Sequence, residues 1–283
     1  MTKKTPRNVI VRNMKLDELK FAEQWAMLEG WNPGLNDITC YSHLDSDGFF
    51  LAEADGEPAG CCFVLNFSEA FSLVGLLIVR PEYRGGMIGM ALINKGSEHV
   101  GSRTCYLDAV ADKVHSYMLL GARRHYPILR CEMAAINGPL AENLVDLTQY
   151  PFEKLAAYDR AFFPADRSRL LAPWIRQKPD GAALGILRGG ELAGYGVIRK
   201  AQTGYRLEPF YAETPELGEK LLLSLTAQVP AGAPVYINLP ETNAYAMSWM
   251  KKYNMQVRLK LMRMYRGAKP ADCDLSKVYS VMG

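Results

Sequence analysis

The chain has 283 residues, of which 49% are hydrophobic and 22% charged, so it is long enough for two ordinary globular domains. Its formal net charge of +3 is too small to favour nucleic acid or a membrane surface as a partner. No apolar run reaches transmembrane length, and the basic N-terminal residues lack the apolar stretch of a signal peptide. Six cysteines and four histidines without metal-ligand spacing predict buried thiols, no metal site and a cytoplasmic location.

The first half of the chain alternates between strand and helix patterns. Two apolar runs flank the turn at residues 54–58, whose Asp-Gly pair is typical of a β-hairpin. Apolar runs rich in β-branched residues indicate the other strands, and helix formers with apolar residues on one side indicate the helices. In chain order we expect strands at residues 9–12, 49–53, 59–65, 71–79, 104–110 and 128–133, and helices at 16–29, 90–95 and 112–120.

The second half repeats this order. Its hairpin turns through Gly-Glu followed by an apolar residue, Ala and Gly, as the first hairpin does. Thr214 and Pro215 are typical of an N-cap and a first helical residue. We expect helices at about 151–162 and 167–175, from Thr214 onward and at 244–252, and strands at 183–187, 192–198, 205–211 and 234–239. The repeat indicates an internal duplication, with its boundary near the chain-breaking Asn137-Gly138-Pro139.

The segment from Val79 to Gly89 joins the strand at 71–79 to a helix through a glycine-rich bend. Glycines let the backbone approach a ligand closely, and the N–H groups in the first turn of a helix attract anions. Arg84 adds a fixed positive charge at the same place. The dinucleotide fingerprint and the P-loop are excluded, because the bend lacks G-x-G-x-x-G and no Gly-Lys-Ser/Thr follows it. The segment therefore predicts a phosphate-binding cradle.

This bend resembles the (Gln/Arg)-x-x-Gly-x-(Gly/Ala) signature of the GNAT superfamily of N-acetyltransferases. Arg84 and Gly89 stand at the ends of the signature, and Met87 occupies the position of its first glycine. In that family the loop holds the pyrophosphate of acetyl-CoA, and a backbone N–H at the end of the preceding strand binds the thioester oxygen. The cofactor-binding residues that the resemblance implies are Leu77, Ile78, Val79, Arg84, Gly85, Gly86, Met87, Ile88 and Gly89.

The resemblance also implies a catalytic acid. In GNAT enzymes a tyrosine four residues before a glycine commonly protonates the leaving thiolate, and Tyr117 and Gly121 have this spacing. A phenol with a pKa of about 10 suits a thiolate whose conjugate acid has a pKa of about 8–9. The alternative, that Tyr117 is simply one of fifteen packing tyrosines, stays open.

The acceptor side of the site is less constrained by sequence. Glu29, Trp31 and Asn32, in and beside a Gly-Trp-Asn-Pro-Gly loop, are the candidate acceptor-binding residues, and a tightly packed loop is the equal alternative. No carboxylate lies on the strand at 71–79, so the general base stays open. The candidates are Asp108, His115 and Glu69, and a chain of water molecules is an alternative.

The second half fails the same two tests. Where the cradle should be, residues 210–215 contain no glycine and place Glu213, which would repel a pyrophosphate, beside the helix start. On the later helix, Met250 replaces the tyrosine and Asn254 the glycine. Because both halves otherwise resemble tandem-GNAT bacterial proteins, we expect two tandem GNAT folds of mixed α/β class: a catalytic domain at 1–138 and a degenerate one at 139–283.

The function implied is that of an acetyl-CoA-dependent N-acetyltransferase. Its acceptor would be the amine of a small-molecule or amino-acid-like compound, which attacks the thioester directly in a ternary complex. The protein would be a monomer or homodimer without a nucleic-acid or membrane partner. Two alternatives stay open: a non-catalytic acyl-CoA-binding module, and a transferase of a longer or acidic acyl group.

Overall fold

A computed structural model describes residues 3–271 and 273–282. Two compact units are present, one comprising residues up to Leu107 with the segment Tyr265–Lys269, and the other comprising Asp108–Met264 with the residues from Pro270 onward. Within the described ranges, no helix is long and apolar enough to span a membrane. Within the same ranges, no group of three His, Cys, Asp or Glu side chains is placed to hold a metal ion. The α/β fold class expected from the sequence is confirmed.

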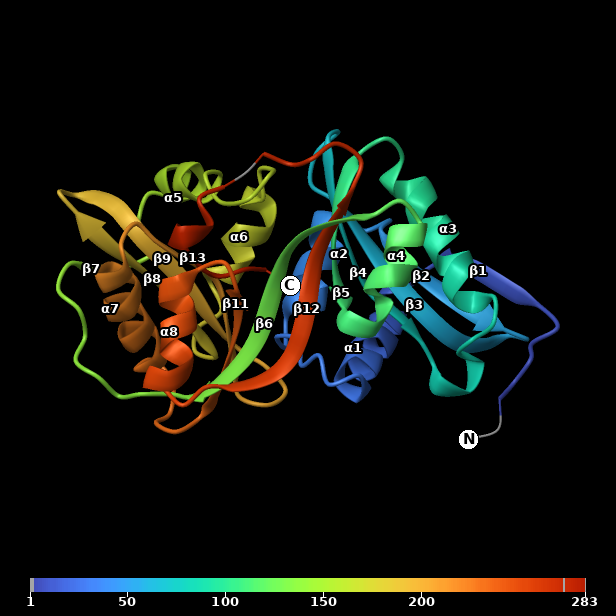
Figure 1. Cartoon of the computed structure of the whole chain (residues 1–283), viewed down its shortest axis with the longest axis horizontal. Coiled ribbons are helices and arrows are strands. Elements are labelled where there is room, and N and C mark those ends of the chain that lie inside the picture. Colours follow the sequence, from blue (N-terminus) through green and yellow to red (C-terminus); the bar gives the residue numbers. More distant parts are fainter. Residues whose placement is uncertain (1–2, 272, 283) are drawn as a thin grey trace. The chain divides into compact units, whose positions relative to one another are not determined.

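The first unit contains a sheet with the strand order β1-β2-β3-β4-β5 (Figure 1). All neighbours are antiparallel except β4 and β5, which run parallel. Its strands are β1 (Val9–Asn13), β2 (Phe49–Ala54), β3 (Glu57–Asn66), β4 (Phe71–Val79) and β5 (Thr104–Val110), whose last three residues belong to the second unit. Its helices are α1 (Leu19–Leu28), α2 (Asp37–Leu44) and α3 (Ile88–Val100).

Helix α3 packs on one face of this sheet, and α1 and α2 pack on the other. Alternation along β3 explains the division, because successive side chains of a strand point to opposite faces. Cys62 and Val64 point toward α3, where a Cβ placed on Gly96 would lie 3.3 Å from Val64 Cγ2. Phe63 points to the other face, against Tyr41 of α2.

The first unit includes residues from the far end of the chain. Arg266 Nη1 donates to Ser97 Oγ at 3.2 Å, and Thr104 Oγ1 donates to Ala268 O at 3.2 Å. The segment 265–269 therefore completes the unit at β5. The predicted division into 1–138 and 139–283 concerns the repeated folds rather than these compact units, and it stays a prediction.

The second unit contains a sheet with the order β12-β6-β11-β10-β9-β8-β7, and β13 pairs with β10. Strands β10 and β11 are parallel, as β4 and β5 are in the first unit. Its strands are β6 (Arg123–Ala134), β7 (Leu144–Asp146), β8 (Gly181–Arg188), β9 (Glu191–Lys200), β10 (Tyr205–Ala212), β11 (Pro234–Pro240), β12 (Gln256–Arg266, to Met264 in this unit) and β13 (Val278–Ser280). The sequence did not predict α2, β7, β12 and β13.

Two apolar clusters lie on opposite faces of this second sheet, one beneath α7 and α8 and the other beneath α5 and α6. The helices of the unit are α4 (Val114–Leu119), α5 (Phe152–Asp159), α6 (Ser168–Trp174), α7 (Pro215–Thr226) and α8 (Ala244–Lys252). The Thr214 side chain accepts from Leu217 N at 3.3 Å, so the predicted N-cap of α7 is confirmed. Leu221, Leu222 and Leu225 of α7 belong to the apolar cluster beneath it and pack the helix on the sheet.

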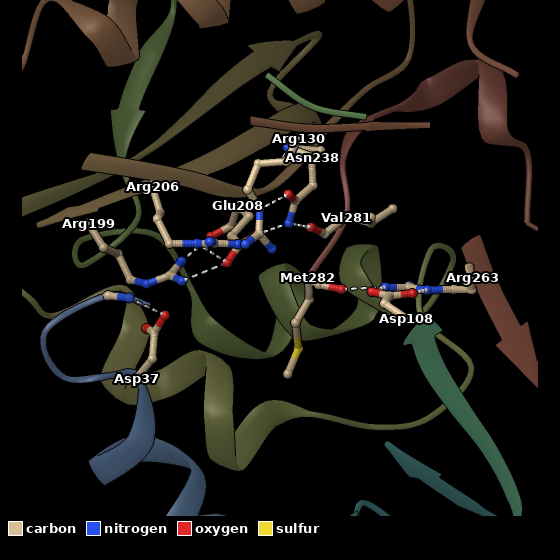
Figure 2. A network of polar contacts seen from close by, with 12 residues as sticks. Asp37, Asp108, Arg130, Arg199, Arg206, Glu208, Asn238, Arg263, Val281 and Met282 are labelled. Carbon is tan, nitrogen blue, oxygen red and sulfur yellow. Dashed lines mark hydrogen bonds and ion pairs between the residues drawn. The ribbon is translucent and has the colours of Figure 1, made fainter. Parts of the chain in front are cut away.

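A buried polar network lies beside β10 and β11 (Figure 2). The carboxylate of Glu208 accepts from Arg206 Nη2 at 2.7 Å, Arg199 Nη2 at 3.2 Å and Asn238 Nδ2 at 2.6 Å. Arg130 Nε donates to Asn238 Oδ1 at 2.8 Å. Because a buried carboxylate is tolerated only when it is paired, these contacts account for Glu208 in the interior of the unit.

Candidate functional site

Strand β4 carries a β-bulge at its centre. Phe63 of β3 lies opposite Gly75 and Cys61 opposite Ile78, so β4 has one extra residue between these two pairs. The bulge places Leu76 in the left-handed region, with φ of 47°. A bulge turns backbone groups out of the regular ladder, and the groups turned here belong to Leu76 and Leu77. The parallel register with β5 covers the residues just before it, from Phe71 to Val74.

The predicted cradle follows β4 directly. Gly85 has φ of 84°, a conformation that favours glycine, and Met87 has φ of −79° and ψ of −15°, which any residue adopts. A Cβ on Gly86 or Gly89 would meet its nearest neighbour only at 3.6 or 3.7 Å, so packing does not require glycine at either position. The room that these two glycines leave is therefore available to a ligand.

Helix α3 begins after Met87 without a side-chain cap. The first N–H groups of a helix have no intrahelical partner, and they carry the positive end of the helix dipole. The Met87 side chain is 74% exposed and leaves these groups uncovered by packing. The start of α3 thus has the electrostatic character of an anion site, and Arg84 and the glycines adjoin it.

Arg84 is held by two contacts within the first unit. Its Nε donates to Val79 O at 2.8 Å, and its Nη2 forms an ion pair with Glu29. The side chain is 47% exposed, so the guanidinium is positioned and still accessible. Glu29, predicted as an acceptor-binding residue, therefore lies beside the cradle arginine, and a pyrophosphate would compete with its carboxylate.

The basic N-terminal segment lies beside the cradle. Lys4 N donates to Glu82 O at 2.8 Å, which ties the N-terminal segment to the turn before the glycines. A Cβ on Gly85 would lie 3.5 Å from Lys3 Nζ. Sequence reasoning noted these basic residues without connecting them to the cradle, because their proximity arises only from folding.

The loop after α1 is firmly packed. Trp31 N donates to Ala26 O at 2.9 Å, and Asn32, 8% exposed, has φ of 46°. Asp37 accepts from Gly34 N at 2.9 Å, a contact drawn in Figure 2. Trp31 and Asn32 belong to the same unit as the cradle, and their contact with an acceptor stays a prediction.

Tyr117 lies in the last turn of α4, in the second unit. Ala122 N donates to Tyr117 O at 3.0 Å and Gly121 N to Met118 O at 3.0 Å, while Gly121 has φ of 86°. These bonds form a Schellman motif, in which glycine ends the helix and fixes the residue four positions earlier. The Tyr-x-x-x-Gly spacing therefore has a structural cause. Because Tyr117 and the cradle belong to different units, their approach to one another stays a prediction.

The same helix ending recurs on α8 with other residues. Met255 N donates to Met250 O at 2.8 Å, and Asn254, with φ of 48°, takes the place of the glycine. Asparagine tolerates the left-handed region better than most residues, so the motif survives. Met250 occupies the place of Tyr117, and its thioether has no proton to donate.

Two candidates for the general base are engaged with arginine. Both carboxylate oxygens of Asp108 accept from Arg263, at 2.8 and 2.7 Å (Figure 2), and Arg263 is buried. This bidentate pair makes Asp108 a structural anchor rather than a free base. Glu69 pairs with Arg103 at the surface. The sequence did not identify Arg263 as the partner, because the two residues are 155 positions apart.

Two family models match the chain, one over residues 45–123 and one over 155–280, and each describes an acetyltransferase (GNAT) domain. Holothin acyltransferase of Pseudoalteromonas sp. (strain SANK 73390) is 27% identical over 259 residues, covering 90% of this chain and 87% of that protein.

Solved structures share the fold. A protein of Pyrococcus horikoshii, provisionally assigned as an acetyltransferase, has a TM-score of 0.83 at 21% identity, covering 99% of this chain and 96% of that one. A tandem GNAT protein from the clavulanic acid biosynthesis pathway has a TM-score of 0.62 at 15% identity, covering 94% and 100%. The chain therefore belongs to the GNAT superfamily and is an acyltransferase with two tandem GNAT domains.

Proposed function

We propose that this acyltransferase transfers an acetyl group from acetyl-CoA to the amine of a small-molecule or amino-acid-like acceptor. The observation that carries the proposal is the continuity of three features in the first unit: the bulge at Leu76, the glycine bend with Arg84, and the uncapped start of α3. Their order along the chain matches the order of thioester and pyrophosphate in the cofactor. The N–H of Leu77, beside the bulge, is the proposed donor to the thioester oxygen.

The chemistry is a direct displacement. The neutral amine attacks the thioester carbon, a C–N bond forms, the C–S bond breaks and the sulfur leaves as thiolate. The proposed acid, Tyr117, donates its phenolic proton to that sulfur, and the amine loses its proton to water. In this proposal the Leu77 N–H stabilises the negative charge that develops on the carbonyl oxygen.

We further propose that the second domain binds no acyl-CoA. Strand β10 has a bulge like that of β4. When the two bulges are aligned, Pro209 of β10 takes the place of Leu77 of β4, and proline has no N–H to donate. The cap from Thr214 already satisfies the Leu217 N–H in the first turn of α7. Strand β13 lies along β10 at Phe210 and Tyr211, just after this bulge.

The test is release of free CoA thiol from acetyl-CoA with a panel of primary amines, for the wild type and for Tyr117→Phe. We expect the variant to bind acetyl-CoA normally and to lose about 100-fold or more in kcat. Tyr245→Phe, at a tyrosine that is 57% exposed on α8, is the matched control and should keep wild-type turnover. Undiminished turnover by Tyr117→Phe across the pH range would contradict the acid role.

The competing proposal is that the protein transfers a different acyl group. The likeness to a protein named holothin acyltransferase supports this alternative, because that name does not specify an acetyl group. The same assay separates the two when it is run with acyl-CoA donors of increasing length.

A further inference from the structure

An aromatic ring covers the acyl end of the proposed site. Phe63 lies opposite Gly75, the residue just before the β4 bulge. A Cβ placed on Gly75 would come within 2.4 Å of Phe63 Cζ, so the ring lies directly over this glycine. Any side chain at position 75 would displace the ring. The glycine is thus explained by Phe63, and the ring borders the stretch of β4 that includes Leu77.

Two further aromatic side chains hold the Phe63 ring in place. The ring centroids of Tyr41 and Phe49 lie 5.5 and 5.8 Å from that of Phe63, each in a tilted arrangement. All three side chains are buried, with Phe63 itself 6% exposed. Interiors are close-packed, so moving one of these rings requires the others to repack. The ring is therefore a rigid wall.

The other face of β4 is closed by the core beneath α3. Cys62 and Val64 of β3 point into that core with Leu92 of α3, and Val74 and Leu77 pack against it. An acyl chain that extends from a carbonyl held at Leu77 cannot enter this aliphatic cluster without opening it. On the opposite face, which α1 and α2 cover, the Phe63 ring is the group that an acyl chain extending along β4 would meet.

We propose that Phe63 limits the length of the acyl group, so that short groups such as acetyl are accepted and longer ones are excluded. The inference rests on the proposed function, because it takes the β4 bulge as the place of the thioester. It names a specificity-determining residue for that site. The ring acts by its volume alone and takes no part in bond making.

The experiment compares kcat/KM for acetyl-, propionyl-, butyryl- and hexanoyl-CoA with one amine that the wild type acetylates. We expect Phe63→Ala to raise the hexanoyl-to-acetyl ratio by about 10- to 100-fold, because a few methylenes in an apolar site change binding by this order. Phe63→Leu should give an intermediate ratio. Phe50→Leu, which removes the same volume from the α3 face, is the matched control and should keep the wild-type ratio.

A second substitution provides a rescue. Adding Gly75→Ala to Phe63→Ala returns a methyl group to the space that the ring occupied. The double variant should lower the hexanoyl-to-acetyl ratio again, toward that of the wild type. Thermal unfolding of every variant identifies those that are folded, and Phe63→Leu carries the test if Phe63→Ala is not.

The outcomes separate this inference from the proposed function. If the wild type neither binds acetyl-CoA nor releases CoA with any amine, the proposed function fails. If the wild type transfers acetyl groups but folded Phe63 variants keep its chain-length profile, only the inference fails. A wild type that prefers hexanoyl-CoA to acetyl-CoA would also overturn the inference.

Discussion

Strands β4 and β10 occupy equivalent places in the two units, and each gains one residue just after its parallel pairing ends. In β4 the extra residue lies between Gly75 and Ile78, and in β10 between Leu207 and Phe210. The residues between these pairs differ in one decisive respect, because Leu77 has an N–H and Pro209 has none. The same backbone device is therefore kept in both units, while the donor it would present is present in only one.

The helix starts that follow the two strands differ in the same direction. The N-cap residue of α3 is Met87, next to Gly85 and Gly86, and it makes no side-chain cap, whereas the N-cap residue of α7 is Thr214, whose hydroxyl accepts from Leu217 N. A cap stabilises a helix by about 1 kcal/mol, and an uncapped start gives up that stability. The first turn of α3 therefore has no N–H group satisfied by a side-chain cap, whereas the first turn of α7 has its Leu217 N–H satisfied by Thr214.

The largest expected effect is a loss of stability in the second domain, which we propose binds no acyl-CoA. Arg167 donates to the two Asp159 oxygens at 2.8 and 2.6 Å, and Tyr195 also donates to Asp159, all in the interior. Asp159→Asn should lower the free energy of unfolding by about 3–5 kcal/mol, because it leaves a buried guanidinium without its counter-charge. Denaturant unfolding measures this loss. The folded Asp159→Asn enzyme should keep its KM for acetyl-CoA, and a raised KM would contradict the proposal that the second domain binds no acyl-CoA.

The next prediction introduces into the β4 bulge the proline that the β10 bulge has at position 209. Leu77→Pro should lower the rate of acetyl transfer by about 100-fold or more, since it removes the proposed donor to the thioester oxygen. Leu77→Ala keeps the N–H and is the control. Pro209→Leu in the second unit should leave the rate of acetyl transfer unchanged. Steady-state kinetics on variants with wild-type melting temperatures decide the matter. A folded Leu77→Pro enzyme with full activity would contradict the proposal that the Leu77 N–H is the donor to the thioester oxygen.

A tenfold effect on acetyl-CoA affinity is expected at one of two ion pairs that have similar exposure. Arg84 pairs with Glu29 beside the cradle, and Arg188 pairs with Glu213 near the start of α7. Arg84→Gln should weaken acetyl-CoA binding about tenfold, or about 1.4 kcal/mol, through loss of a charge at the pyrophosphate. Arg188→Gln should leave the affinity unchanged. Isothermal titration calorimetry gives both values, and equal losses would place the cofactor elsewhere.

The smallest effect concerns stability and pH in the first unit. Hydrogen bonds from Arg12 hold the pKa of Glu18 at about 2, below its ordinary value of 4.5. Because the folded-state pKa is depressed, the pair stabilises the fold above the ordinary pKa, and this stability is lost as pH falls through about 2. Glu18→Gln should cost about 0.5–1 kcal/mol at neutral pH. Unfolding curves of the variant and the wild type should converge in acid, and a constant gap would exclude the linkage.

Local patterns explain what could be predicted from the sequence. The Asp-Gly turn, the Thr214 cap and the Tyr117 to Gly121 spacing each involve residues a few positions apart, where one physical rule decides the conformation. Long-range features escaped prediction for the converse reason. Asp108 and Arg263 are 155 positions apart, and no periodicity links them. The β4 bulge could not be predicted from the sequence, because it is defined by the register of β4 against β3.

The placement of β13 has a consequence for how the protein is made. Asn238 N donates to Ser280 Oγ at 3.0 Å and Val281 N to Asn238 O at 3.1 Å, so β13 contacts β11 just past the residues where β10 and β11 pair, in the interior of the second unit. The first unit in turn includes Tyr265–Lys269. During synthesis, domains usually fold as each emerges from the ribosome. Neither unit is complete until these segments have emerged from the ribosome, so neither can finish folding when only its N-terminal part has been made.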